Sequence, residues 1–171
     1  MFVQLALERG EIMNLKETID SELNRLAGGS GSTCVLSVDT TSGRLESEIT
    51  ALDSIGCAFQ TFQLTTERLA GASIEHLQKL SEQLSQQLSY LLEPITPIEV
   101  DIDRCIVQMR SSPPAKDDDA TSYYELNVCR GGDLSLRRYS KTPGQMRQMV
   151  PAKVTREVFC RLAVDFDAVL N

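Results

Sequence analysis

Apolar residues recur at helical spacing between residues 74 and 92. They are Ile74, Leu77, Leu80, Leu84, Leu88, Leu91 and Leu92. At about 100° per residue these positions fall within an arc of roughly 120°, and Ser81 is the one polar residue inside it. The opposite face is rich in amide, hydroxyl and charged groups. The pattern predicts an amphipathic helix that packs on another layer, and alternating segments on both sides of it indicate that this layer is a sheet.

Two further segments show the same periodicity. The first runs from Ile12 to Leu26 and is ended by the glycine-rich residues 28–32. The second follows Pro151 and Thr155, and one face of it carries Val158, Phe159, Leu162, Ala163, Phe166, Val169 and Leu170. Cys160 and Val164 lie outside that arc, which leaves open a subunit contact or a deeper burial of the helix.

Strand-like alternation fills the remaining chain. Residues 33–39, 44–52 and 57–64 precede the central helix, and in the second of these Leu45, Ser47 and Ile49 alternate with Glu46 and Glu48. After the helix, residues 98–109 alternate with a change of parity near Asp103, which predicts a bulge or bend there. A hairpin follows over residues 124–136, with its turn at 130–133, and then a further edge strand over residues 146–150.

These elements predict one α+β domain over residues 1–171. We expect an antiparallel sheet of about five to six strands with three helices packed against it, in the order α-βββ-α-βββ-α. Residues 111–122, a polar segment that contains two prolines, are expected to form a mobile loop. Residues 8–10 could be encoded by a purine-rich ribosome-binding sequence, which leaves open whether translation starts at Met1 or Met13. With a start at Met13, residues 1–12 would lie upstream of the true start.

The cysteines and the apolar content indicate the cellular compartment in which we expect the protein. The five cysteines are odd in number and widely spaced, without a CxxC pair, which is typical of reduced thiols in a cytoplasmic protein. The sequence contains no apolar run of membrane-spanning length and no pattern typical of a signal peptide. With His76 as the single histidine, we expect no metal site and no cofactor.

The net charge of −7 is distributed unevenly. Residues 121–171 hold eight basic and five acidic residues, a net +3, whereas residues 1–120 hold nine and nineteen, a net −10. The overall acidity argues against nucleic acid as a partner, because neutralising phosphates requires a basic surface. The asymmetry indicates either two halves that face each other or a basic patch for an anionic partner.

Several candidate sites have a simpler structural interpretation. The glycine-rich residues 28–32 connect a helix to a strand, whereas phosphate-binding loops run from strand to helix. The run Asp117–Asp119 lies in a polar loop, and Glu99, Asp101 and Asp103 fit the solvent face of a strand. A cysteine nucleophile would need a base, and His76 lies on the polar face of the central helix. We therefore expect a protein that is not an enzyme.

The most suggestive group of residues surrounds a tyrosine near the last predicted strands. It consists of Arg137, Arg138, Tyr139, Lys141 and Arg147, with Lys153 downstream. Cations around an aromatic ring suit recognition of a carboxylate or phosphate. The alternative interpretation is that these charges protect an edge strand from sheet-to-sheet association.

The element order, small size and acidity resemble the small dimeric chaperones of type III secretion, which place helices over an antiparallel sheet. The resemblance is one of architecture, so it transfers no functional residues. The function we expect is a cytoplasmic protein-interaction module, chaperone-like or an adaptor, whose partner is another protein or a second copy in a homodimer, with neither nucleic acid nor membrane as partner. The alternative is a regulatory domain that binds a small ligand or anion.

Overall fold

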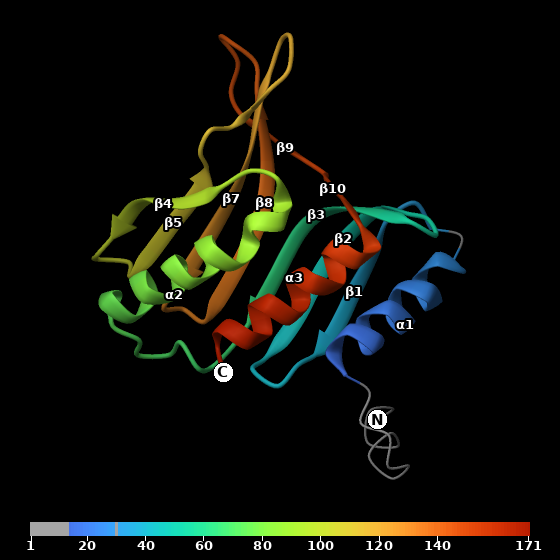
Figure 1. Ribbon diagram of the computed structural model, residues 1–171, viewed down its shortest axis with the longest axis horizontal. Coiled ribbons are helices and arrows are strands. Elements are labelled where there is room, and N and C mark those ends of the chain that lie inside the picture. The colour runs from blue at the N-terminus through green and yellow to red at the C-terminus, as the bar shows by residue number, and fades with distance from the viewer. Residues whose placement is uncertain (1–13, 30) are drawn as a thin grey trace.

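The computed structural model describes residues 14–29 and 31–171, so Ile12 and the two candidate start sites lie outside the described residues. Figure 1 shows the order of the elements. The helices are α1 (Leu15–Ala27), α2 (Ile74–Gln87), a 3₁₀ turn η1 (Leu88–Leu91) and α3 (Arg156–Val169). The strands are β1 (Cys34–Asp39), β2 (Arg44–Leu52), β3 (Gly56–Thr65), β4 (Ile95–Asp101), β5 (Ile106–Ser111), β6 (Ala115–Lys116), β7 (Thr121–Cys129), β8 (Asp133–Lys141), β9 (Gln148–Val150) and β10 (Ala152–Thr155).

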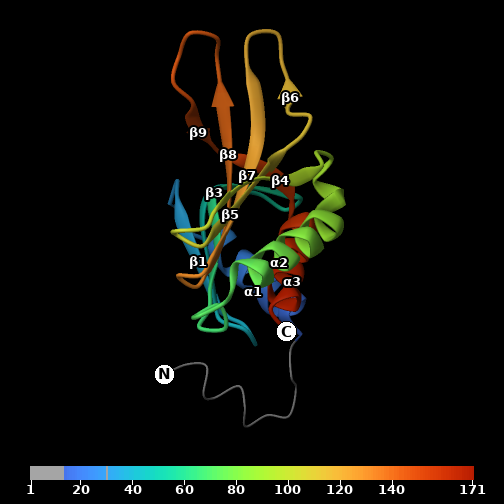
Figure 2. The same ribbon diagram turned by 90° about the vertical axis from the view of Figure 1, so that its left-hand side faces the viewer.

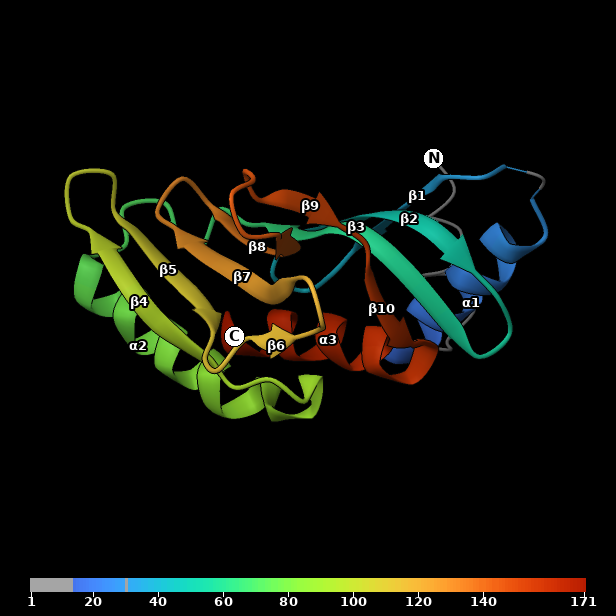
Figure 3. The ribbon, with the colours of Figure 1, turned by 90° about the horizontal axis from the view of Figure 1, so that it is seen from above.

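All the strands belong to one antiparallel sheet. Its main path runs β1-β2-β3-β8-β7-β5-β4, and β10, β6 and β9 pair with β3, β7 and β8 respectively. The three helices lie on the same side of this sheet (Figure 3). The α+β class, the antiparallel sheet and the three helices are therefore confirmed. The other side of the sheet carries no helix of the described residues.

Local sequence explains where the helices begin. Asn14 caps α1 by accepting a hydrogen bond from the backbone N–H of Glu17, whose carboxylate accepts one from Asn14 in return. Ser73 and Thr155 cap α2 and α3 through their hydroxyl groups. These caps satisfy backbone groups that the first turn of each helix leaves without a partner.

The core lies between the helices and the inward positions of the strands. Its centre is an aromatic cluster in which Phe62 of β3 contacts Phe59, Phe159 and Phe166 with ring centroids 5.1–5.6 Å apart. The predicted alternation of β2 is confirmed, since Leu45, Ser47 and Ile49 are buried and the glutamates between them are exposed. Cys160 is buried as well, where α3 contacts α1, whereas Val164 remains partly exposed.

Within residues 14–29 and 31–171 the sheet has ten strands, so the prediction of five to six is wrong. The change of parity near Asp103 marks a reversal of the chain: residues 102–105 form the turn between β4 and β5, and these strands pair with each other. Cys105, expected in a strand, lies in this turn with a φ of 51°. The bulge of β4 lies between Pro97 and Glu99 instead.

Further strands come from segments too short to show periodicity. The loop 111–122 contains the two-residue strand β6, and β10 precedes the last helix. The central helix ends at Gln87 and continues as the turn η1, so Leu92 falls outside it and is 91% exposed. Leu92 is therefore wrongly assigned to the buried arc.

Two hairpins extend beyond the rest of the sheet, as Figure 2 shows. One joins β6 to β7 and the other joins β8 to β9. The first carries Asp117–Asp119, which are all exposed, and the second carries Lys141, Met146 and Arg147.

Candidate binding surface

The side of the sheet opposite the helices is named here the uncovered face. Because neighbouring side chains along a strand point to opposite sides, the residues between the buried positions of β5, β7 and β8 belong to it. The residues that belong to the hydrophobic core beneath the helices are Val107 and Met109 on β5, and Tyr124, Leu126 and Val128 on β7. Gln108, Arg110, Asn127 and others between them therefore face away from the helices.

Strand register brings three charged residues of the uncovered face into one row. Arg110 of β5 pairs with Glu125 of β7, and Glu125 pairs with Arg137 of β8. The next row along the strands pairs Tyr123 with Tyr139, and Tyr139 with Met149 of β9. A carboxylate thus lies between two arginines, beside a pair of tyrosines.

Glu125 is the most buried charged residue of this face, with a side chain only 5% exposed. Its Oε2 atom accepts hydrogen bonds from Arg110 Nη2 at 3.3 Å and from Arg147 Nη1 at 2.5 Å. Arg147 reaches Glu125 from the turn between β8 and β9. A nearly buried carboxylate needs such partners, because an unpaired charge there would be strongly unfavourable.

Each of these arginines also lies over a tyrosine ring. The guanidinium carbon of Arg110 is 4.7 Å from the ring centroid of Tyr123, and that of Arg147 is 4.2 Å from the centroid of Tyr139. The two rings stack with centroids 6.0 Å apart. Hydrogen bonds to the Tyr123 hydroxyl and to Glu125 raise the pKa of Arg147, so this guanidinium stays charged.

Arg138 belongs to the helix-covered side. It donates a hydrogen bond from Nη1 to Glu93 Oε2 at 2.6 Å and lies 4.6 Å from the ring centroid of Tyr124. Burial raises the pKa of Tyr124 above its ordinary value, and the nearby Arg138 only partly offsets that rise. Glu93 precedes β4, so this pair ties β8 to the segment that follows η1.

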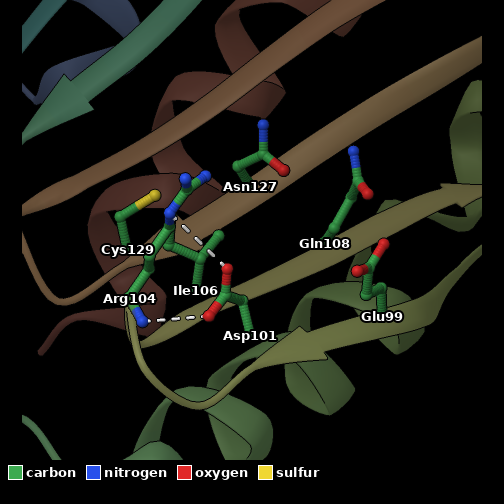
Figure 4. A pocket seen from close by; sticks show the side chains of 7 residues that line it. All are labelled: Glu99, Asp101, Arg104, Ile106, Gln108, Asn127 and Cys129. Carbon is green, nitrogen blue, oxygen red and sulfur yellow. Dashed lines mark hydrogen bonds and ion pairs between the residues drawn. The ribbon is translucent and has the colours of Figure 1, made fainter.

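A hollow of about 280 Å³ lies next to the charged row (Figure 4). Seven residues line it: Glu99, Asp101, Arg104, Ile106, Gln108, Asn127 and Cys129. Arg104 Nε lies 3.8 Å from Asp101 Oδ2, which partly balances the acidic wall. Burial raises the pKa of the Cys129 thiol to about 11, so at neutral pH it is protonated and a poor nucleophile.

The structure separates the residues of the sequence-predicted site. Arg137, Tyr139 and Arg147 lie together on the uncovered face, Arg138 lies on the opposite side, and Lys141 is exposed at the end of β8. The interpretation of Arg137, Arg138 and Lys141 as edge-strand charges is wrong, because β8 lies inside the sheet, with β7 on one side and with β3 and then β9 on the other.

Sequence reasoning missed the partners of these arginines. Glu125, Tyr123 and Tyr124 come from β7, Arg110 from β5 and Glu93 from the link before β4. The sequence holds one signal for part of this group. Glu125 stands between apolar neighbours in a strand, and the turn at residues 130–132 connects that strand to the one that carries the arginines. The contribution of Arg110 depends on the order of strands, which no local pattern reveals.

The two ends of the sheet differ in how their outer sides are protected. At β4, Pro97 lacks a backbone N–H, a bulge follows it, and Glu99 and Asp101 are acidic. These are common devices against strand pairing at an edge. At β1 the strand is regular in its pairing with β2 and contains no proline, and Val35 is 59% exposed. No strand of the described residues pairs with the outer side of β1.

The geometry defines an α+β protein with one helix-covered and one uncovered sheet face. A scan against protein-family models finds no match to this chain, and a search of curated proteins finds none. Among solved structures, a DUF4468 family protein from Bacteroides ovatus is similar over 70% of this chain and 84% of that chain, with 11% sequence identity and a TM-score of 0.29. A likeness at that level carries no argument about function. Over residues 14–29 and 31–171, no helix has the length and apolar character to span a membrane.

Proposed function

We propose that this protein is a cytoplasmic, non-enzymatic protein-interaction module, chaperone-like or an adaptor, that works as a homodimer. The observation that carries the proposal is the outer side of β1. This side offers regularly spaced backbone N–H and C=O groups to an extended segment, and such an edge adds a strand from a partner through main-chain hydrogen bonds.

A second copy of β1 fits this edge without like charges facing each other. If two β1 strands pair antiparallel around a two-fold axis at Leu36, Val35 meets Ser37 and Cys34 meets Val38 of the other copy, so that side chains on the same face of the sheet lie opposite each other. The symmetric pairing repeats each contact twice, as in closed dimers. The free edge at β4, with its proline and its carboxylates, has a poorer composition for the same contact.

The alternative, a regulatory domain that binds a small ligand or anion, has weaker support in the geometry. Arg138 and Arg147 each donate to a carboxylate of the chain, so their charges are already balanced. Arg137 makes no ion pair with a carboxylate of the described residues, but one arginine is a small basis for an anion site.

The test is the mass of the purified full chain in solution, measured by light scattering after size-exclusion chromatography. We expect a dimer for the parent and a monomer for Val35→Lys, because a lysine on an edge strand disfavours pairing. The matched control is Ile55→Lys, since Ile55 is also an exposed apolar residue but lies in the turn between β2 and β3. It should remain a dimer with an unchanged melting temperature.

A second measurement locates the contact. In the dimer, backbone amides of β1 that point away from β2 should exchange with solvent more slowly than in Val35→Lys. A monomeric parent, or a dimer in which Val35→Lys changes neither the mass nor the exchange of β1, would contradict the proposal.

A further inference from the structure

Arg147 occupies a site that belongs to other strands. The site, named here the arginine seat, consists of Glu125, Tyr123 and Tyr139, from β7 and β8. Its occupant comes from a different kind of element, the strap formed by residues 142–150, which contains the turn after β8 and strand β9. The seat is therefore part of the sheet, whereas the cation in it belongs to a surface segment.

The seat has the composition that a guanidinium group requires. A carboxylate offers charged acceptors at its base, and the stacked tyrosine rings offer a flat aromatic face. Arginine binds such a combination better than lysine, because its planar group stacks on a ring while its N–H groups donate to the carboxylate. The low exposure of Glu125 strengthens this attraction, since solvent screens it little.

The strap is held to the sheet by few contacts. Three residues of β9 pair with β8, and residues 143–149 are all exposed. Among the described residues, Arg147 supplies the only side-chain hydrogen bonds between the strap and the rest of the protein, and its own side chain is 41% exposed. Weakly packed segments of this kind open locally at low free-energy cost.

The seat remains intact when Arg147 leaves it. Glu125 keeps its bond to Arg110, and Arg110 stays over the ring of Tyr123, so the carboxylate is not left as a buried unpaired charge. An arginine from another molecule would replace Arg147 with no change in the total charge of the site. The exchange therefore avoids the desolvation cost that opposes most insertions of a charge.

We propose that the arginine seat binds an arginine side chain presented by a partner protein, and that Arg147 is a competitor within the same chain. The strap then sets the threshold for binding, because the partner must displace a tethered arginine whose effective concentration is in the millimolar range. This inference extends the proposed interaction function, but it uses a surface different from the edge of β1. Failure of either one leaves the other testable.

The experiment measures binding of the peptide acetyl-Gly-Gly-Arg-Gly-Gly-amide to the full chain by calorimetry. Removing the competitor in Arg147→Ala should tighten the apparent affinity about tenfold, because the seat is then always open. Arg147→Gln, which keeps most of the side-chain stem, should do the same if Arg147→Ala disturbs the strap. The control Arg25→Ala removes an exposed arginine of α1, on the other side of the sheet, and should match the parent.

Two peptide analogues and one further variant test the chemistry of the seat. The same peptide with citrulline, which is neutral, should not bind, and the one with lysine should bind more weakly. In Arg147→Ala the side-chain CH₂ protons of the bound arginine should show upfield ring-current shifts, and Tyr139→Leu should abolish them. Equal binding of the citrulline or lysine peptide, or no binding by either Arg147 variant, would overturn the proposal, whatever the mass of the protein is.

Discussion

The two sides of the sheet are stabilised by different kinds of contact. On the helix-covered side, aromatic and aliphatic side chains fill the core, and one carboxylate buried there, that of Asp167 in α3, accepts hydrogen bonds from the uncharged groups of Thr41 and Ser42. On the uncovered side, Glu125 is held by arginines that solvent still reaches. Short uncharged donors whose positions are fixed by the backbone allow one arrangement of hydrogen bonds around a carboxylate. A long charged side chain that pairs with a carboxylate can instead be replaced by another of the same charge.

This contrast indicates where structure and function are expected to separate. Asp167 fastens the end of α3 to the turn between β1 and β2, and Arg68 reinforces the same corner by donating to the carbonyl oxygens of Thr41 and Leu170. Loss of these bonds should loosen the fold. Glu125 and its arginines join no helix to the sheet, so changes there should alter binding more than stability.

The largest expected effect is on the covered side. Leu84 of α2 is fully buried, so Leu84→Asp would bury an unpaired charge and cost more than about 4 kcal/mol, enough to unfold the protein. Gln83→Asp places the same carboxylate on the exposed face of the same helix and should be tolerated. Thermal melts followed by circular dichroism compare the two, and equal melting temperatures would mean that the covered side does not depend on this packing.

Asp167 should give the next largest effect. Asp167→Ala removes hydrogen bonds from Thr41 and Ser42 and should cost about 3 kcal/mol, measured by urea unfolding. Burial alone would raise the pKa of Asp167, but these hydrogen bonds outweigh it and lower the pKa below its ordinary value.

The lowered pKa of Asp167 fixes the sign of the pH dependence. Its contribution to stability is present above the ordinary pKa of about 4 and is lost as pH falls through the folded-state value below it. Asp167→Asn should therefore show a smaller loss of stability between about pH 4 and pH 2 than the parent does. An identical acid dependence in the two proteins would mean that Asp167 does not stabilise the covered side through its charge.

Two adjacent arginines compare the two sides directly. Arg138→Ser leaves the largely buried Glu93 without its partner and should lower the free energy of unfolding by about 2 kcal/mol. Arg137→Ser, on the uncovered face, removes no ion pair to a carboxylate of the described residues and should cost less than about 1 kcal/mol. Urea unfolding of both variants checks the difference. A larger loss of stability in Arg137→Ser than in Arg138→Ser would show that the two arginines are assigned to the wrong sides of the sheet.

The fold was predictable wherever a single segment carries its own pattern. The alternation of β2, the apolar arc of α3 and the cap at Thr155 are local, because each depends on residues a few positions apart. At residues 102–105 the sequence pattern predicts a bulge or bend and the chain reverses instead, since a tight turn and a bulge change the parity of a strand in the same way. Strands β6 and β10 are too short for periodicity to show.

The binding surface was predictable only in part, for a topological reason. The chain places Arg137, Tyr139 and Arg147 close together in sequence, so their cluster is visible there. Which side each residue faces depends on strand parity, and this separates Arg138 from its neighbour. The partner Glu125 meets Arg110 only because β7 lies between β5 and β8, an order that long-range contacts decide.

The smallest effect concerns chemical reactivity and leaves stability unchanged. Cys129 lies on the uncovered face and is partly exposed, whereas Cys57 of β3 belongs to the core and is buried, and burial raises its pKa to about 12. Iodoacetamide should label Cys129 in the native protein at a rate that rises about tenfold per pH unit until its pKa of about 11, because only the thiolate reacts. Cys57 should be labelled only when the protein unfolds, at the rate of unfolding.

Mass spectrometry of tryptic peptides follows both sites, with urea-denatured protein as the control in which both are labelled. Native labelling of Cys57 as fast as Cys129 would show that the helices do not seal their side of the sheet.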